Sequence, residues 1–317
     1  MSCIYKGEVI DTNLSQNAKG GTEMMRERIV SNISKDLLEN FAIHLSRPRK
    51  MYEDVKNIFY CHDLVGDPEN KILRDGGWNK FDHFVFVSQW QRDQYVLVYG
   101  IPYSKCTVIP NAIEKEFEFK QKSKDTIEFI YHTTPHRGLE LVYPIFDALS
   151  KQHDNIHLDV FSSFGVYGWK QRDEPYKDLF KKIEDHPNMS YHGAADNQTV
   201  LNTLDETHIF MYPCIWQETS CIALIEAIRS GVVCIHPNYG ALTETASGAS
   251  IAYEYTEDIN EHANRCMNLT SQVISLINES PGNFEKLVNS NKNVLPRNGI
   301  NSFTKSWNGL LEYLSNV

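Results

Sequence analysis

Residues 208–248 read HIFMYPCIWQETSCIALIEAIRSGVVCIHPNYGALTETASG. The apolar runs at Ile209–Pro213 and Val232–Ile235 are long enough for two buried strands. Between them, Ala223–Arg229 carries apolar residues at helical spacing, and Gly231 follows where a left-handed residue ends many helices. A polar break and a second predicted helix come after the second strand. This order of strand, helix, strand and helix is typical of a βαβ unit in a parallel sheet.

Two carboxylates frame the start of the predicted helix. Glu218 lies at its mouth, and Glu226 follows two turns later. At 100° per residue the second carboxylate returns to within about 80° of the first. Amides at a helix N-terminus favour an anion, and here they belong to Thr219, Ser220, Cys221 and Ile222. This arrangement suits a ligand that carries both phosphate and hydroxyl groups; the alternative is an amphipathic helix with one capping and one solvated glutamate.

Length and charge narrow the class of protein. A chain of 317 residues suggests two domains. A net charge of -10 and a pI of about 5.6 argue against a nucleic-acid surface, and we expect no nucleic-acid partner. Residues 1–120 contain 16 basic and 17 acidic side chains, so the remainder carries nearly all of the negative charge. The near-neutral first part is the better candidate for contact with an anionic or membrane-bound partner.

The cysteines and the hydropathy pattern bear on the compartment. Seven cysteines are scattered without a CxxC pair, so we expect reduced thiols and a cytoplasmic location. We expect no signal peptide, and no apolar run approaches the ~20 residues of a membrane span. An Asp-x-Asp pair, which holds a divalent ion in some transferases, is absent from the sequence. We therefore expect no bound metal and no cofactor.

The first 120 residues contain two candidate ligand loops. Gly20-Gly21 precedes a predicted helix at Glu23–Ile33 and would allow a close backbone approach to a ligand, although a simple turn is the alternative. The predicted strand Ile58–Cys61 ends in His62 and Asp63. Ligands of open parallel sheets bind at the carboxyl ends of strands, which places these two side chains at a candidate site. A capping aspartate and a satisfied surface histidine are the alternative.

A new sheet is predicted to begin at Ile127–Tyr131, after a charged, aperiodic linker at Glu114–Lys124. The loop that follows contains Arg137 and Gly138, and an arginine after a strand can grip a phosphate in bidentate fashion. The alternative is a surface arginine that caps a helix. We expect one weak strand at most in Met1–Ile10.

Strands and helices alternate through the rest of the chain, which predicts an α/β protein of two doubly wound units. The other predicted strands are Phe41–Leu45, Phe84–Val87, Thr107–Ile109, His157–Phe161 and Met189–His192. The other predicted helices are Trp90–Tyr99, Leu139–Ser150, Asp173–Glu184, Asn197–Glu206, one or two within Asp258–Asn278, and Phe303–Leu314.

Four sequence blocks, in the right order, resemble a retaining glycosyltransferase of the GT-B architecture, similar to family 4. They are the Gly20-Gly21-Thr22-Glu23 loop, the segment from Val87-Ser88 through Gly100-Ile101-Pro102 to Val108–Ile113, Pro135-His136-Arg137-Gly138-Leu139, and Glu218–Glu226 with Ala227 and Gly231. The resemblance is best over residues 80–250. It implies two Rossmann-like domains that face a central cleft: an acceptor domain at 1–120, to which a helix at 301–317 crosses back, and a donor domain at 121–300.

The resemblance also implies roles for the candidate residues. Glu226 would accept hydrogen bonds from the ribose of a UDP- or GDP-linked sugar, and Glu218 would hold hydroxyls of the transferred sugar. The leaving diphosphate would be neutralised by Arg137 and by the amides of Cys221 and Ile222, while Gly21, Thr219 and Ser220 complete the donor site. His62 and Asp63 would line the side of a glycan, lipid-linked or other hydroxyl acceptor, with His62 counted among the catalytic groups. Peripheral membrane contact is left open.

Two features depart from the family pattern. The position that is often arginine, five residues before Arg137, is His132, so charge neutralisation would rest on Arg137 or on a lysine such as Lys170. The usual Gly-Phe-Gly after the first glutamate is Thr219-Ser220-Cys221, which implies a differently shaped sugar pocket. The rival functions are a GT-B module that binds a nucleotide sugar without transfer, and a nucleotide-sugar epimerase or a phosphorylase on the same scaffold.

Overall fold

The computed structural model describes residues 2–11, 20–48, 50–114, 120, 122, 125–290 and 297–317. It divides into two compact units. The first comprises 1–114, 218–222 and 296–317, and the second comprises 115–217 and 223–295. Most of the predicted linker at Glu114–Lys124, and most of the loop before Gly20, lie outside the described residues.

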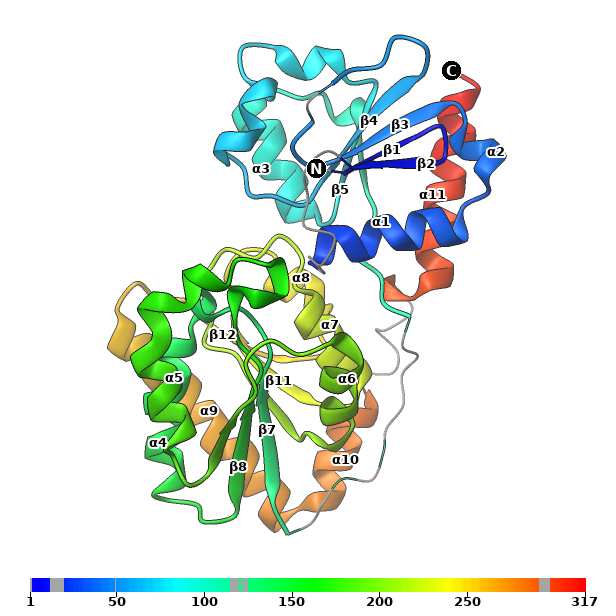
Figure 1. Ribbon diagram of the computed structural model, residues 1–317. Helices are drawn as coiled ribbons and strands as arrows, with labels where there is room; N and C mark the ends of the chain where they lie inside the picture. The colour runs from blue at the N-terminus through cyan, green and yellow to red at the C-terminus, as the bar shows by residue number, and fades with distance from the viewer. Residues whose placement is uncertain are drawn as a thin grey trace. The chain divides into compact units, whose positions relative to one another are not determined.

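The first unit is built on a six-stranded sheet in the order β2-β1-β3-β4-β5-β6 (Figure 1). Its strands are β1 (Ser2–Tyr5), β2 (Glu8–Asp11), β3 (Phe41–Leu45), β4 (Lys56–Cys61), β5 (His83–Phe86) and β6 (Cys106–Val108). The strands from β3 to β6 are parallel, whereas β1 pairs antiparallel with both β2 and β3. The expectation of one weak N-terminal strand was therefore wrong. Lys6 and Gly7, both with positive φ, form the two-residue turn that a hairpin requires.

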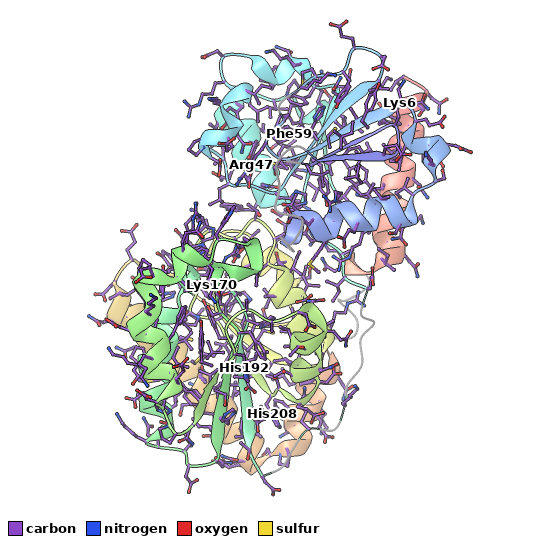
Figure 2. The ribbon with its side chains drawn as sticks, in the orientation of Figure 1. Lys6, Arg47, Phe59, Lys170, His192 and His208 are labelled. Atoms are coloured by element: carbon purple, nitrogen blue, oxygen red, sulfur yellow. The ribbon has the colours of Figure 1, made fainter. Side chains whose placement is uncertain are left out.

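Helices bury both faces of this sheet. They are α1 (Gly21–Asn32), α2 (Lys35–Leu38), α3 (Gln89–Tyr99) and α11 (Ile300–Ser315), with 3₁₀ helices η1 (Pro68–Leu73), η2 (Gly77–Lys80) and η3 (Tyr103–Lys105). On one face, Met25 of α1 and Trp307 of α11 pack with Tyr60 of β4. On the other face, Phe59 packs with Tyr95 of α3. Figure 2 shows Phe59 within this sheet and Lys6 at the hairpin turn.

The second unit holds a parallel six-stranded sheet in the order β12-β11-β10-β7-β8-β9. Its strands are β7 (Ile127–Tyr131), β8 (Ile156–Val160), β9 (Met189–Tyr191), β10 (Ile209–Met211), β11 (Val233–Pro237) and β12 (Ile251–Tyr253). Its helices are α4 (Leu139–Ser150), α5 (Lys177–Glu184), α6 (Asn197–Glu206), α7 (Ile222–Arg229), α8 (Leu242–Ala246), α9 (Ile259–Glu279) and α10 (Pro281–Ser290), with 3₁₀ helices η4 (Pro135–Arg137), η5 (Phe164–Tyr167) and η6 (Lys170–Tyr176). Figure 1 shows α4, α5 and α9 on one side of this sheet and α6, α7 and α10 on the other.

Local chemistry explains where these elements end. Gly231, two residues after the last residue of α7, has a φ of 67°, and the Val232 amide donates back to the Ala227 carbonyl, as the helix end predicted there requires. The helix predicted over Asp173–Glu184 begins only at Lys177, because Pro175 cannot supply the amide of a regular α-helix and the preceding segment is 3₁₀. In the described part of the chain, no helix is both long enough and apolar enough to cross a membrane.

Candidate active site

The loop Glu218–Ile222 carries most of the predicted donor residues. Because α7 begins at Ile222, Glu218 lies outside the helix, and the predicted angular relation between Glu218 and Glu226 around one helix was wrong. Glu218 belongs to the first unit and Glu226 to the second. Both carboxylates are nevertheless buried, with exposed fractions of 4% and 5%. A solvated surface glutamate is therefore excluded at either position.

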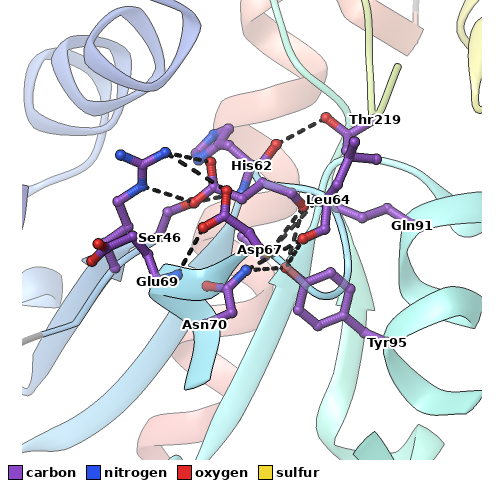
Figure 3. A network of polar contacts seen from close by, with 12 residues as sticks. Ser46, His62, Leu64, Asp67, Glu69, Asn70, Gln91, Tyr95 and Thr219 are labelled. Atoms are coloured by element: carbon purple, nitrogen blue, oxygen red, sulfur yellow. Dashed lines mark hydrogen bonds and ion pairs between the residues drawn. The ribbon is translucent and has the colours of Figure 1, made fainter. Parts of the chain in front are cut away.

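Thr219 ties this loop to the first candidate acceptor residue. Its Oγ1 hydroxyl donates a hydrogen bond of 2.9 Å to the main-chain carbonyl of His62, which follows β4 (Figure 3). The amide of His62 in turn donates to the Oγ of Ser46, at 2.9 Å. The structure thus brings His62 and Thr219, which are distant in sequence, into direct contact.

The His62 side chain is half-buried, with both ring nitrogens buried, and its ring is neutral. Its ring packs against Tyr60 with 4.2 Å between the ring centroids. Burial lowers the pKa of His62 to about 3. Among the described residues neither ring nitrogen has a hydrogen-bond partner, which is unusual for a buried polar group. A neutral imidazole of this kind can accept a hydrogen bond from a bound hydroxyl or donate one to it. The alternative of a satisfied surface histidine is excluded.

Asp63 is held by an arginine that the sequence analysis missed. The Nε of Arg47 lies 3.2 Å from Oδ2 of Asp63, and its Nη2 lies 3.4 Å from Oδ1. Burial is the largest influence on the Asp63 carboxyl and raises its pKa, although Arg47 acts in the opposite direction. The aspartate therefore does not cap the following 3₁₀ helix; Asp67 accepts the Glu69 amide there instead.

Three fully buried polar side chains, those of Asn70, Gln91 and Tyr95, form hydrogen bonds that support the main chain of the loop after β4 (Figure 3). The Nε2 of Gln91 donates to the Asp63 carbonyl at 2.8 Å. The hydroxyl of Tyr95 lies 3.2 Å from the carbonyls of both Asp63 and Leu64, and it accepts a 2.6 Å bond from Asn70. Gln91 and Tyr95 are one helical turn apart on α3. That spacing of two polar side chains was the only feature of the sequence that could have predicted this support.

In the second unit, Arg137 lies on a turn that only glycine can complete. Gly138 has a φ of 124°, and a Cβ placed on it would lie 2.3 Å from the carbonyl oxygen of Pro213. The Ile215 amide donates to the Arg137 carbonyl at 3.3 Å, which fixes the turn against the segment after β10. The cation-glycine pair of the sequence is thus a packing requirement, and the contact of Arg137 with phosphate stays a prediction.

Glu226 and Gly21 occupy well-defined surroundings in their own units. The Nδ2 of Asn197, at the start of α6, donates to Oε1 of Glu226 at 2.9 Å. Helix α1 begins at Gly21, and the Glu23 carboxylate accepts the Gly20 amide at 3.0 Å. A Cβ on Gly21 would lie 2.9 Å from Cδ1 of Ile222, so the glycine lets these two helix starts approach closely. Contact of Gly21 with a donor stays a prediction.

Family models match the chain over both units. A model described as glycosyl transferases group 1 matches residues 111–272, which is just over half of the chain. The chain belongs to the group 1 glycosyl transferases. A second model, described as glycosyltransferase family 4, matches residues 36–117. No curated protein matches the sequence.

Solved structures with the same fold include several glycosyltransferases. A glycosyltransferase from Rickettsia africae has a TM-score of 0.68 and 14% identity, over 97% of this chain and 85% of that one. The pneumococcal O-GlcNAc transferase GtfA, in complex with UDP and GlcNAc, has a TM-score of 0.63 and 12% identity, over 83% of this chain. Anabaena HepE, in complex with UDP-glucose, has a TM-score of 0.61 and 13% identity, over 83% of this chain and 73% of that one. These neighbours, together with the two parallel-sheet units, confirm the predicted GT-B architecture.

The matched neighbours differ in length. This glycosyl transferase spans 53% of pneumococcal GtfA, which is about half of that chain.

In this glycosyl transferase, His132 does not replace the charge of the arginine common at its position. Its Nε2 lies 3.1 Å from the carbonyl oxygen of Ala223 in the first turn of α7, and its ring packs on Phe210. Burial lowers the pKa of His132 to about 4, so the ring is neutral near pH 7. Lys170, the other cation considered, is exposed at the start of η6 (Figure 2).

Within the described residues, one group of side chains has the spacing of metal ligands. Glu128, His157 and Asp159 place one ligand atom each within 4.8 Å of one another on β7 and β8. Nδ1 of His157 lies 3.2 Å from Oε2 of Glu128, and its Nε2 lies 3.0 Å from the Oγ of Ser190. These polar groups already satisfy one another across neighbouring strands, so the cluster needs no cation to explain it. None of the seven cysteines, all of which lie in the described residues, forms a disulfide.

Proposed function

We propose that this chain transfers a sugar from a nucleotide-sugar donor to a hydroxyl acceptor and retains the anomeric configuration. The observation that carries the proposal is the burial of two carboxylates, that of Glu218 four residues before α7 in the sequence and that of Glu226 within α7. A carboxylate has two oxygens that accept hydrogen bonds from hydroxyl groups, and the amides that begin a helix favour an anion. A nucleotide sugar offers hydroxyls to the carboxylates and a diphosphate to the amides.

Each carboxylate then has its own substrate group. Glu226 accepts hydrogen bonds from the vicinal ribose hydroxyls, because a carboxylate has two acceptor oxygens. Glu218 holds hydroxyls of the transferred sugar. Arg137 and the amides of Cys221 and Ile222 stabilise the charge that develops on the leaving diphosphate, which is electrostatic catalysis without an enzymic nucleophile. A UDP-linked sugar is the favoured donor, because the structures of pneumococcal GtfA and Anabaena HepE contain UDP and UDP-glucose.

The acceptor is assigned to the His62 side. The ring nitrogens of neutral His62, which bond to none of the described residues, suit a hydrogen bond to the attacking hydroxyl, and Asp63, paired with Arg47, shapes the same loop. A glycan, a lipid-linked saccharide or another hydroxyl compound fits this chemistry. The proposed setting is the cytoplasm, with peripheral membrane contact for a lipid-linked acceptor.

A thermal-shift screen against UDP-, GDP- and ADP-sugars tests the donor. A ligand at 100 times its dissociation constant adds about 2.7 kcal/mol to the free energy of unfolding, which is easily detected. Turnover of the stabilising donor is then measured with and without candidate acceptors. A transferase needs an acceptor or hydrolyses the donor slowly, an epimerase converts its sugar and a phosphorylase needs phosphate. An intact donor under all conditions would mean a binding module.

Two further measurements test the mechanism. Because Arg137 and the α7 amides take the place of a metal, EDTA should leave the rate unchanged; rescue of a lost rate by manganese would contradict these roles. NMR of the first product formed from an α-linked donor should show an α-linkage. A β-linked product would show that the acceptor attacks from the opposite face.

A further inference from the structure

The first unit is assembled from three separate stretches of chain, and Asn111 contacts the other two from its own stretch. The Nδ2 of Asn111 donates to the main-chain carbonyl of Ser220 at 3.1 Å. Its own main-chain carbonyl accepts a 2.7 Å bond from Nδ2 of Asn298. The amide of Ile113 donates to the Asn298 carbonyl at 3.0 Å, which completes the junction.

The amide of Asn111 is held in one orientation at an energetic cost. The residue is 4% exposed, and its Oδ1 atom is buried without a hydrogen-bond partner in the part of the chain that the structure describes. Turning the amide over would place Oδ1 against the Ser220 carbonyl oxygen, which also only accepts hydrogen bonds. The group that faces Ser220 is therefore the NH₂ group. An apolar side chain of the same shape would avoid the unpaired oxygen, so the contact with Ser220 is what an asparagine supplies here.

The geometry of the peptide bond gives that contact its consequence. The carbonyl of Ser220 and the amide of Cys221 belong to one planar, trans peptide unit, in which C=O and N–H point in opposite directions. A hydrogen bond that holds the Ser220 carbonyl toward Asn111 therefore sets the direction of the Cys221 amide. The hydroxyl of Thr219, bonded to the His62 carbonyl, fixes the preceding residue of the same loop.

We propose that Asn111 is a positioning residue for the diphosphate of the donor, which it never touches: it orients the Cys221 amide by holding the carbonyl of Ser220. The inference rests on the proposed function for the identity of the ligand. The order of the loop Glu218–Ile222 does not depend on the proposed function, because Asn111 fixes the loop whether or not a ligand is bound.

The order of the loop is tested through Cys221. This thiol is 2% exposed, and Cys234 on β11, which is fully buried, serves as an internal reference. The rates at which N-ethylmaleimide labels both residues are measured by mass spectrometry of peptides from the intact chain. Asn111→Leu should label Cys221 about tenfold faster and leave Cys234 unchanged, because local opening exposes only the loop. Labelling of Cys221 at the wild-type rate would overturn the proposal.

Asn298→Leu is the matched control. It removes an equally buried asparagine and a bond to Asn111, but not the bond to Ser220. We expect wild-type labelling of Cys221 in this variant. If both variants speed labelling equally, the junction as a whole orders the loop and the specific role of Asn111 is wrong. Should Asn111→Leu fail to fold, Asn111→Ala replaces it, because it also removes the donor to Ser220 and introduces neither extra volume nor a buried charge.

The second readout is affinity for UDP by calorimetry. Asn111→Leu should weaken UDP binding about tenfold while the thermal unfolding midpoint stays near that of wild type, since one oriented bond to the diphosphate is lost. A merely structural role would lower the midpoint and leave the affinity of the folded fraction unchanged. If wild type binds neither UDP nor GDP, the proposed function fails, and the labelling of Cys221 still decides the role of Asn111.

Discussion

The loop at residues 62–67 and the loop at residues 132–138 each follow a parallel strand and open with a buried, neutral histidine. They are held in different ways. In the first, buried side chains of α3 and η1 donate hydrogen bonds to the loop carbonyls. In the second, the Gly138 backbone packs on Pro213. The centroid of the His136 ring lies 5.2 Å from that of Phe164 and 4.8 Å from that of Trp216.

The difference decides what each histidine can do. His132 uses Nε2 to bond the Ala223 carbonyl and thereby becomes part of the scaffold under α7. The loop of His62 is supported through its main chain, and no described residue forms a hydrogen bond with the ring nitrogens. A histidine in the same place on two sheets is thus structural in one unit and available to a ligand in the other.

The largest expected effect comes from breaking the glycine support of the second loop. Gly138→Ala should lower the free energy of unfolding by about 3 kcal/mol or more, because the new methyl group meets the Pro213 carbonyl at a strained φ. Gly66→Ala in the first loop is the control. Its φ of 81° is also positive, but none of the described residues lies within 4 Å of the added Cβ, so roughly 1 kcal/mol is expected. Urea denaturation measures both, and equal losses would show that packing on Pro213 is unimportant.

The next effect separates the two carboxylates. Glu218→Gln should mainly lower kcat, because the transferred sugar changes charge during reaction, whereas Glu226→Gln should raise the donor KM, because the ribose does not react. One hydrogen bond to a charged group is worth about 1.5–3 kcal/mol, or roughly 10- to 150-fold. UDP alone should bind Glu218→Gln nearly as well as wild type and Glu226→Gln more weakly. Calorimetry that finds equal weakening would reverse or remove these assignments.

A pH dependence should arise from both histidines. The pKa values of His62 and His132, about 3 and about 4, lie below the 6.5 of an unfolded histidine, so the unfolded chain takes up protons that the folded chain does not. Stability should therefore fall as pH falls from about 6.5 to 4, by up to about 1.4 kcal/mol per pH unit for each ring. His62→Phe and His132→Gln should each flatten this slope in urea denaturation at stepped pH.

His157→Gln is the control for that slope. The bond to Glu128 raises the pKa of His157, so its stabilisation is complete below the unfolded pKa and is lost only as pH rises through the folded value. The variant should leave the slope between pH 4 and 6.5 unchanged. An unchanged slope in His62→Phe as well would mean that His62 is protonated in the folded chain.

The smallest effect tests the support behind His62. Tyr95→Phe removes the hydroxyl that bonds the Asp63 and Leu64 carbonyls, and should cost about 1 kcal/mol of stability. If the support positions His62, kcat should fall while the donor KM stays unchanged. Tyr99→Phe, which removes only a 3.3 Å bond to the Gly66 amide, is the control. Equal kinetics in the two variants would show that Tyr95 does not position the loop.

Elements with a strong local signal were predicted from the sequence. The strand and helix around Glu226 were predicted to within two residues, because apolar periodicity and Gly231 mark them locally. Elements with a weak local signal were missed. Strand β12 has only three residues, and α10 follows α9 with a single residue between them. The antiparallel β1–β2 hairpin depends on the Lys6-Gly7 turn, which a strand pattern alone does not show.

The same division applies to the candidate site. Apolar periodicity, turn residues and the position of each loop after a strand are properties of the local sequence, and by themselves they determined the α/β class and the candidate residues His62, Arg137, Glu218 and Glu226. Tertiary structure alone decided the partners. Arg47 beside Asp63, Tyr95 behind the loop and Asn111 on Ser220 are hydrogen bonds between residues far apart in the chain, and their formation depends on distances that only the folded sheet and helices fix.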